Sequence, residues 1–324
     1  MHTSVALCTY NGQKYLTEQI ESILDQSVPV DEIIICDDKS SDATIEIIEG
    51  FISRGASIKL YKNPVNLGFT KNFEKAIGLC SGDIIFLADQ DDIWYRDKVG
   101  MILDYFERHP DKEYLFTNGI LINEWGLDSY GRSIFDIVGI TGKNKTLLDQ
   151  GHFYDVLGVT GKILGAITAF RASFLPYCLP FPQMGKYAIH DGIITATAVI
   201  WNKIAYIDQC LIKYRIHGNQ TVGLNYRFKF LPQSYELADD VLMWHEGLVE
   251  TYRPQDMAQL RIFYKRFWTL HSRFSFFKLL SMYLHGEYKM YYKDYHPVFF
   301  RDVRGAFIRL NHNVKERIRK ICNQ

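Results

Sequence analysis

Short apolar runs alternate with amphipathic stretches through the first part of the chain. Runs of strand length, rich in β-branched residues, lie at 3–8, 32–36, 57–61 and 84–88. Between them, apolar residues recur three and four positions apart, as they do on a helix that packs against a sheet. The connections are short enough for right-handed crossovers between parallel strands. This pattern predicts an α/β fold in which a mostly parallel, Rossmann-like sheet is flanked by helices.

The alternation is harder to read after the fourth strand. Later apolar runs predict a helix over 95–109, strands over 114–117 and 163–170, and a buried helix over 193–201. We expect Trp94 in the core, at the head of the first of these helices. Glycines and polar residues interrupt any period over 126–161, so we expect loops there.

Polar residues follow each of the first four predicted strands. In order, they are Thr9-Tyr10-Asn11, Asp37-Asp38, Asn66-Leu67-Gly68 and Asp89-Gln90-Asp91-Asp92. Ligands of parallel sheets bind beyond the carboxyl ends of the strands, so these residues are expected to meet at one edge. The chain has no GxGxxG after its first strand and no Walker GxxxxGK, so neither a dinucleotide cradle nor an ATP cradle is indicated.

The fourth strand end places three carboxylates within four residues, at Asp89, Asp91 and Asp92. Such a cluster repels itself unless a cation binds to it. Hard oxygen ligands suit Mg2+ or Mn2+, and these ions in turn bind diphosphates. A solvated acidic turn, with Asp92 capping a following helix, is the alternative.

The composition is that of a globular protein, with 47% apolar and 23% charged residues, but the charge is unevenly spread. Residues 253–324 hold 15 Lys and Arg against 5 Asp and Glu, whereas residues 1–252 hold 22 against 32. The six cysteines form no CxxC pair, which favours a reducing compartment. We see neither a signal peptide nor an apolar run of membrane-spanning length, so we expect a cytoplasmic protein that is soluble or peripheral.

Taken in order, the strand-end motifs resemble those of the inverting glycosyltransferases of family 2, which have the GT-A fold. The motifs are Thr9-Tyr10-Asn11-Gly12, Asp37-Asp38 with Asp42, Asn66 with Gly68, and Asp89-Gln90-Asp91-Asp92 with Trp94. The resemblance covers roughly residues 3–225. It implies a catalytic domain over 1–225, with a nucleotide-binding half over 1–94 and an acceptor half over 95–225.

The resemblance also implies a donor site for a nucleotide-diphosphate sugar. Its candidate residues are Thr9, Tyr10, Asn11, Asp37, Asp38, Asn66, Asp89 and Arg215. Thr9, Tyr10 and Asp38 would contact the base and ribose, with Asp37 supporting them. Asp89 would face the ribose or the sugar. Helix capping at a surface turn is the alternative for the Asp37-Asp38 pair.

Two later segments would supply the remaining chemistry. An inverting transfer needs a base, and the family has its catalytic carboxylate where this chain has His190-Asp191. Asp191 is the candidate base and His190 a candidate acceptor contact, although Asp191 could instead cap the following helix. Arg215 and His217 lie two residues apart on one predicted strand face, so both could reach a diphosphate. Arg215 would be a charge clamp, and His217 would join Asp91 as a ligand of Mg2+ or Mn2+.

These features predict a metal-dependent inverting glycosyltransferase that acts on a lipid-linked saccharide acceptor in bacterial surface polysaccharide synthesis. The runs Asp-Gln-Asp-Asp-Ile-Trp and Tyr-Arg-Ile-His-Gly-Asn resemble rhamnosyltransferases, which favours dTDP-L-rhamnose as donor, and other hexosyl donors stay open. A sugar nucleotidyltransferase is one alternative, but it needs a glycine-rich basic loop after the first strand. A catalytically silent scaffold or nucleic-acid binder is another, and the acidic body argues against nucleic acid.

Residues 226–324 are expected to form a helical C-terminal region that is basic and aromatic. Apolar residues recur at helical spacing at Leu260, Phe263, Phe267 and Leu270. Arg266 lies among the charges off this stripe. Such a helix suits an anionic membrane surface, so we expect peripheral attachment at the inner face of the cell membrane. Packing on the catalytic domain or on a second subunit, in a homo-oligomer, is the alternative.

Overall fold

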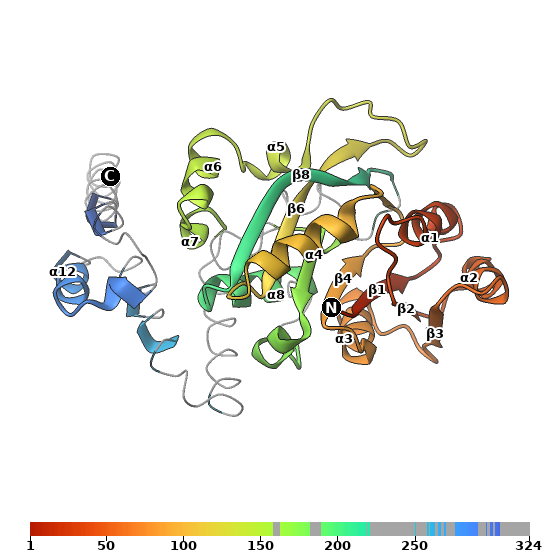
Figure 1. The fold of residues 1–324 in the computed structure, drawn as a ribbon, viewed down its shortest axis with the longest axis horizontal. Helices are drawn as coiled ribbons and strands as arrows, with labels where there is room; N and C mark the ends of the chain where they lie inside the picture. Colours follow the sequence, from red (N-terminus) through yellow and green to blue (C-terminus); the bar gives the residue numbers. More distant parts are fainter. Residues whose placement is uncertain are drawn as a thin grey trace, which may run out of the picture. The chain divides into compact units, whose positions relative to one another are not determined.

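In the computed structural model of this chain, residues 3–215 contain an eight-stranded sheet (Figure 1). The structure describes residues 1–157, 163–181, 189–218 and 220, and farther on 250, 258, 260–262, 265–266, 269, 276–290, 296, 299–300 and 302–304. The strand order in the sheet is β3-β2-β1-β4-β7-β6-β8-β5.

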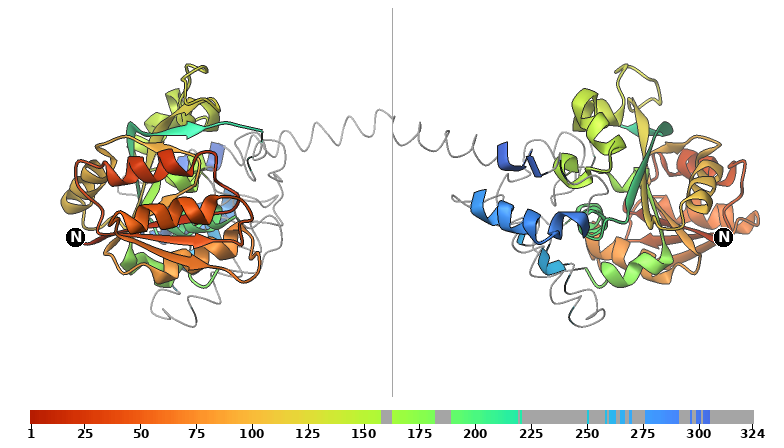
Figure 2. Two further views of the ribbon diagram at one scale, coloured as in Figure 1. Left: turned by 90° about the vertical axis from the view of Figure 1, so that its right-hand side faces the viewer. Right: turned by 60° about the vertical axis from the view of Figure 1, so that its left-hand side comes forward.

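The first half of the sheet confirms the predicted alternation. Its elements are β1 (Thr3–Thr9), α1 (Leu16–Leu24), β2 (Glu32–Asp37), α2 (Thr44–Ser53), β3 (Ile58–Lys62), α3 (Phe69–Leu79) and β4 (Ile84–Ala88). β1 pairs in parallel with β2 and β4, and β2 pairs in parallel with β3. Every residue of β2 and β4 is buried, because helices pack around this part of the sheet (Figure 2). The parallel register brings the carboxyl ends of these strands to one edge.

The second half adds antiparallel strands. Its elements are β5 (Ile93–Trp94), α4 (Lys98–Arg108), β6 (Tyr114–Ile122), α5 (Ile134–Val138), α6 (Gly142–Asp149), α7 (Phe153–Leu157), η1 (Gly165–Ile167), β7 (Thr168–Arg171), η2 (Ala172–Tyr177), α8 (His190–Ile200) and β8 (Ile204–Arg215). β7 runs antiparallel between β4 and β6, whereas β6 and β8 are parallel. The prediction of a mostly parallel α/β sheet is confirmed.

Two of the predicted boundaries are wrong. Trp94 is buried as expected, but it lies on the short strand β5, which pairs with β8 through Trp94 and Ile212. That pairing joins segments far apart in the sequence, so no local pattern predicts it. The expected strand over 163–170 is divided into the turn η1 and the strand β7.

The segment 126–161 is also different from the expected loops, because it contains α5, α6 and α7. These helices have five to eight residues, too short for a clear apolar period. α5 begins with a capping box, in which Ser133 Oγ accepts a hydrogen bond from Asp136 N at 3.2 Å. Ser133 N donates back to Asp136 Oδ2 at 2.8 Å.

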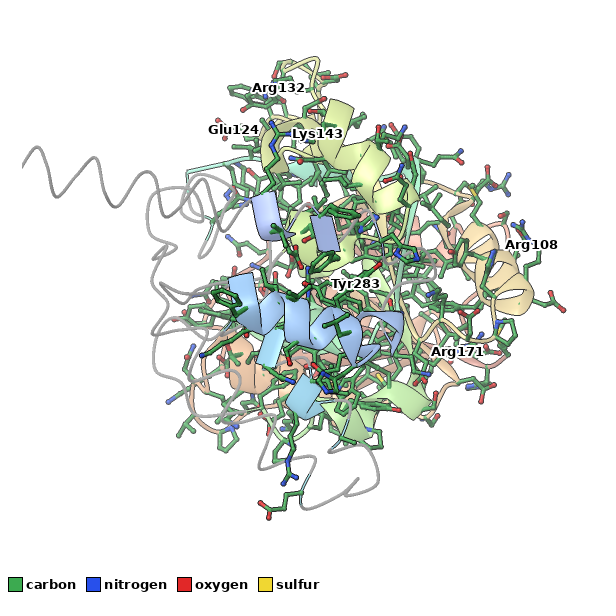
Figure 3. The ribbon with its side chains drawn as sticks, turned by 90° about the vertical axis from the view of Figure 1, so that its left-hand side faces the viewer. Arg108, Glu124, Arg132, Lys143, Arg171 and Tyr283 are labelled. Atoms are coloured by element: carbon green, nitrogen blue, oxygen red, sulfur yellow. The ribbon has the colours of Figure 1, made fainter. Side chains whose placement is uncertain are left out.

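The chain divides into two compact units, Met1–Val199 with Lys203–His245, and Ile200–Asn202 with Glu246–Gln324. In the second unit, α12 (Phe276–Leu284) and η5 (Glu287–Met290) are described. Leu279 and Met282 are buried on one face of α12. Tyr283 of the same helix, labelled in Figure 3, stacks on Phe299 with 4.2 Å between ring centroids. None of the helices in the described part of the chain is long and apolar enough to cross a bilayer.

Arg266, one of the charged residues off the predicted apolar stripe, is buried in this unit. Its guanidinium is buried and donates to Asp302 Oδ2 and Oδ1 at 3.1 and 3.2 Å. Leu260, on the predicted apolar stripe, is buried as expected. The other three members of the stripe, residues 263, 267 and 270, lie outside the described residues.

Candidate active site

A cavity of about 280 Å³ opens at the carboxyl ends of β1, β2 and β4. Nine of the predicted site residues line it: Thr9, Tyr10, Asp38, Asn66, Asp89, Asp91, His190, Asp191 and His217. Three others, Asn11, Asp37 and Arg215, do not. Residues from the first strand ends and from α8 and β8 therefore face one space, although up to about two hundred positions separate them in the sequence.

Asp38 organises one wall of the cavity. Its carboxylate, 2% exposed, accepts hydrogen bonds from Asn63 Nδ2, Leu67 N and Gly68 N at 2.9, 2.7 and 2.9 Å. Asn66 Nδ2 donates to the main-chain oxygen of Asp38 at 3.1 Å. Gly68 has a φ of 78°, a left-handed conformation that favours glycine, and α3 begins at the next residue. Asp38 thus holds the loop before α3 against the cavity.

Asp37 and Asn11 support this wall from behind. Asp37 accepts hydrogen bonds from Thr9 Oγ1 at 2.8 Å and from Ser40 N at 2.9 Å. Asn11, with a φ of 48°, accepts one from Ser41 N at 2.8 Å. Both side chains therefore fix the loops that follow β1 and β2. Thr9 and Tyr10 present the lining.

Gln90 is a site residue for which the sequence analysis proposed no role. Its side-chain amide pairs with the main chain of Tyr10, accepting from Tyr10 N at 2.9 Å and donating to Tyr10 O at 3.1 Å. This pairing ties the end of β1 to the loop after β4, and it leaves the Tyr10 side chain half exposed at the cavity. In the sequence, the signal for a role of Gln90 at the site is its position inside the acidic run 89–92.

Asp91 and His217 meet in the cavity lining. His217 Nε2 lies 2.8 Å from Asp91 Oδ2, and the two side chains are 11% and 15% exposed. The His217 ring also packs on Tyr15, with 4.8 Å between centroids. An imidazole nitrogen and a carboxylate oxygen that point at each other can take one divalent cation between them. Among the residues described, no group of three or more His, Cys, Asp or Glu is arranged so that it could hold a metal ion.

Arg215, expected as a diphosphate clamp, points away from the cavity. Its guanidinium is 1% exposed and donates to Asp91 O at 2.8 Å and to Glu124 O at 3.2 Å. It also pairs with Glu18 and packs over the Tyr15 ring. The Arg215 side chain is therefore buried and hydrogen-bonded to the protein, and it does not line the cavity. Arg215 therefore fixes the backbone of Asp91 and the loop after β6, where Glu124 lies (Figure 3).

The opposite wall carries His190 and Asp191, at the start of α8. Both are 5% exposed. Asp191 is the second residue of the helix, and its Oδ2 accepts a hydrogen bond from Gly165 N at 3.0 Å, from a different segment. The His190 ring stacks on Phe73, with 3.9 Å between centroids. Phe73, a residue of α3, also lines the cavity.

Two charged residues lie beneath the cavity floor. Asp92 and Lys98 are both fully buried. Burial raises the pKa of Asp92 well above its usual range, and the neighbouring charges of Asp91 and Asp89 raise it further. Burial lowers the pKa of Lys98 to about 7, against the opposing effect of Asp92 and Asp89. Asp92 Oδ1 accepts a hydrogen bond from Arg215 N at 3.0 Å, so it does not act as a helix cap.

Comparisons with known proteins place the relatives of this chain among glycosyltransferases. The family model described as Glycosyl transferase family 2 matches residues 4–156. An uncharacterized glycosyltransferase of Haemophilus influenzae is 27% identical over 220 residues, which cover 67% of this chain and 66% of that protein. The dTDP-rhamnosyl transferase RfbG of Shigella flexneri is 30% identical over 234 residues, which cover 69% of this chain and 75% of that protein.

The fold is also found in a solved structure. S. aureus TarS 1-349, crystallised in complex with UDP-GlcNAc, superposes with a TM-score of 0.56 and 18% identity, over 80% of this chain and 69% of that one. The sheet of this chain therefore has the GT-A-like fold of that structure. The chain belongs to glycosyltransferase family 2.

Proposed function

We propose that this protein is a metal-dependent inverting glycosyltransferase that moves L-rhamnose from dTDP-L-rhamnose to a lipid-linked saccharide in bacterial surface polysaccharide synthesis. One observation carries the proposal. A single cavity is lined by the strand-end carboxylates Asp38, Asp89 and Asp91 and also by Asp191. The strand-end group suits a nucleotide diphosphate with its cation, and Asp191 suits the removal of a proton.

The donor half of the cavity has surfaces for each part of a nucleotide sugar. The half-exposed ring of Tyr10 offers a face for the base, and Thr9 and Asp38 lie beside it. Asp38 Oδ2 accepts one hydrogen bond, from Gly68 N, and a carboxylate oxygen has room for a second, from a ribose hydroxyl. Asp89 lines the next part of the cavity and would face the ribose or the sugar.

Asp91 and His217 would hold the cation. Asp91 Oδ2 and His217 Nε2 lie 2.8 Å apart, so they would supply one oxygen and one nitrogen ligand from segments that are distant in the sequence. Arg215 fixes the main chain of Asp91 through its carbonyl oxygen, which orients the carboxylate. When bound there, Mg2+ or Mn2+ would neutralise the charge that builds up on the leaving diphosphate.

Asp191 would act as the general base. Its carboxylate takes the proton of the acceptor hydroxyl while that oxygen forms a bond to the anomeric carbon. The bond from the anomeric carbon to the diphosphate oxygen breaks on the opposite face, so the configuration is inverted and the nucleoside diphosphate leaves. Gly165 N donates a hydrogen bond to Asp191 Oδ2, which holds this carboxylate at the cavity. His190, held by Phe73, would contact the acceptor.

The nature of the donor rests on the relative from Shigella flexneri, whose name states a dTDP-rhamnosyl transferase. Thermal unfolding with a panel of nucleotide sugars, each with Mn2+ or Mg2+, tests it directly, because a ligand that binds the native state raises the midpoint. We expect dTDP-L-rhamnose to give the largest rise and UDP-GlcNAc a smaller one. A larger rise with a uridine sugar would overturn the choice of donor and leave the reaction class in place.

The base is tested by Asp191→Asn. Asn keeps the size of the side chain and its ability to accept from Gly165 N, but it cannot take a proton. We expect turnover to fall by about 10²- to 10⁴-fold, while donor-induced stabilisation is kept. Unchanged turnover would refute the assignment of Asp191. Retained turnover of the donor in excess chelator would refute the metal assignment separately.

We also propose that residues 226–324 form a separate C-terminal region that attaches the enzyme to an anionic membrane surface. On α12, Phe277 and Leu284 are 78% and 72% exposed, although the other face of the helix is buried. A helix that is apolar on both faces needs a second apolar surface or the interface of a bilayer. The excess of basic residues over 253–324 favours anionic lipid, and a lipid-linked acceptor would be present there.

Co-sedimentation with phosphatidylglycerol vesicles tests this attachment on the full chain. We expect binding at low salt, weaker binding as salt is added, and a large loss in the double variant Phe277→Ser with Leu284→Ser. Ile52→Ser is the matched control, because Ile52 is an exposed apolar residue of the first unit. Equal binding of both variants, or no binding of the wild type, would refute attachment through α12, and a concentration-dependent dimer would identify this face as a subunit contact.

A further inference from the structure

A fully buried lysine lies under the wall of the cavity that carries Asp191. Lys98, the first residue of α4, is 0% exposed. Its ammonium donates to Ala166 O at 2.9 Å and lies 3.8 Å from the centroid of the Trp94 ring. Burying an ammonium is costly, and an apolar side chain of the same length would fill this space at lower cost. Some function of the charged donor is therefore expected.

The carbonyl that Lys98 holds belongs to the turn that contacts Asp191. Ala166 is the middle residue of η1, and Gly165, just before it, donates its N–H to Asp191 Oδ2 at 3.0 Å. The turn lies close against α8, since a Cβ added to Gly165 would lie 3.0 Å from His190 Nε2 and 3.6 Å from Asp191 Cβ. A shift of the turn would therefore move the carboxylate.

The same buried layer also supports the other wall. Asp92, six residues before Lys98, accepts a hydrogen bond from Arg215 N at 3.0 Å, at the end of β8 and two residues before His217. Lys98 thus holds the segment with Gly165, which donates to Asp191, and Asp92 holds the segment that leads to His217.

We propose that Lys98 is a positioning residue for the transfer step: it fixes the 165–167 turn through Ala166 O, and the turn holds the Asp191 carboxylate through Gly165 N. The proposal rests on the role of Asp191 as the base. It assigns Lys98 no contact with substrate. Its loss should therefore affect turnover more than donor affinity, because Lys98 donates to Ala166 O on the Asp191 side, whereas Asp92 keeps its own hydrogen bond with Arg215 N.

Lys98→Met tests the proposal, since Met fills the same volume and removes the donor to Ala166 O. We expect kcat to fall by about 10- to 100-fold, as for a displaced catalytic group, with the donor KM changed by less than about twofold. Val99→Ala is the matched control, because Val99 is equally buried on the same helix. That control should lower stability and leave kcat near wild type.

A double-mutant cycle separates positioning from general loss of structure. In the Asp191→Asn background, Lys98→Met should lower the residual turnover no further, because the carboxylate that it positions is already absent. Additive losses, an unchanged kcat in Lys98→Met, or a donor KM that rises in parallel with the loss of kcat would each overturn the proposal. Unchanged turnover in Asp191→Asn alone would instead refute the proposed base.

If Lys98→Met does not fold, Gly165→Ala displaces the same turn from the other side. The added methyl group would lie within 3.0 Å of His190 Nε2. We expect the same pattern, a lower kcat with the donor KM kept and no additional loss in the Asp191→Asn background. Full turnover in Gly165→Ala would overturn the proposal.

Discussion

Glu32 joins the strands at the end of the sheet opposite the cavity. Its side chain is buried, and Oε1 accepts hydrogen bonds from Ser4 Oγ at 2.6 Å and from Ser81 N at 2.7 Å. Lys59 Nζ donates to Oε2 at 2.7 Å. These contacts connect β1, β2 and β3 with the turn that precedes β4. Replacing Glu32 with Gln should therefore weaken the sheet without touching the site.

The size of the effect follows from the pKa of Glu32. Burial opposes ionisation, but the hydrogen bonds from Lys59, Ser4 and Ser81 outweigh it and lower the pKa from 4.5 to about 2. A shift of this size corresponds to about 3 kcal/mol of stability at neutral pH. Because the folded pKa is the lower one, this stability is fully present above pH 4.5 and is lost as the pH falls toward 2. At pH 3 about 1.4 kcal/mol would remain.

Urea unfolding of the wild type and of Glu32→Gln, at pH 7 and at pH 3, measures this difference. We expect the variant to be less stable by about 2–3 kcal/mol at pH 7, since the partly exposed Lys59 is screened by solvent, and the difference to shrink at pH 3. Glu46→Gln, at an exposed position of α2, is the control and should change little. A difference that does not depend on pH would refute the role of the charge, and a fall in kcat would refute the separation of sheet stability from the site.

Three further predictions concern charged residues. Asp91→Asn should remove most of the Mn2+-dependent turnover and keep the unfolding midpoint, because the carboxylate lies in the cavity lining; full activity at low Mn2+ would contradict it. Arg215→Lys should lower stability by about 2–4 kcal/mol and weaken Mn2+ activation, since Lys cannot hold Asp91 O and Glu124 O together. Unchanged urea unfolding curves would argue against this supporting role of Arg215. Asp302→Asn should destabilise the second unit by about 3 kcal/mol, because it leaves the buried Arg266 charge uncompensated; limited proteolysis would detect this as faster cleavage, and unaltered cleavage would count against it.

The sequence by itself determined the alternation of β1 to β4 with their helices and the meeting of their polar ends. Both depend on local apolar periods and on the rule that parallel strands end at one edge. The placement of Thr9, Asp38 and Asp89 around one cavity therefore follows from pattern alone. Short elements cannot be predicted in this way, since the five-residue helices α5 and α7 show no usable apolar period.

Only the tertiary structure decided which distant groups touch. His217 reaches Asp91 across 126 positions, whereas Arg215, two residues earlier at the end of β8, turns to main-chain oxygens and to Glu18. Strand alternation determines the face on which a side chain lies. The position of the guanidinium at the end of a long Arg side chain depends instead on which buried acceptors need a hydrogen-bond donor. Lys98 shows the same limit most clearly, because in the sequence it is one charge at the start of a helix. Its burial and its bond to Ala166 O arise only when α4 packs beneath the turn that holds Asp191.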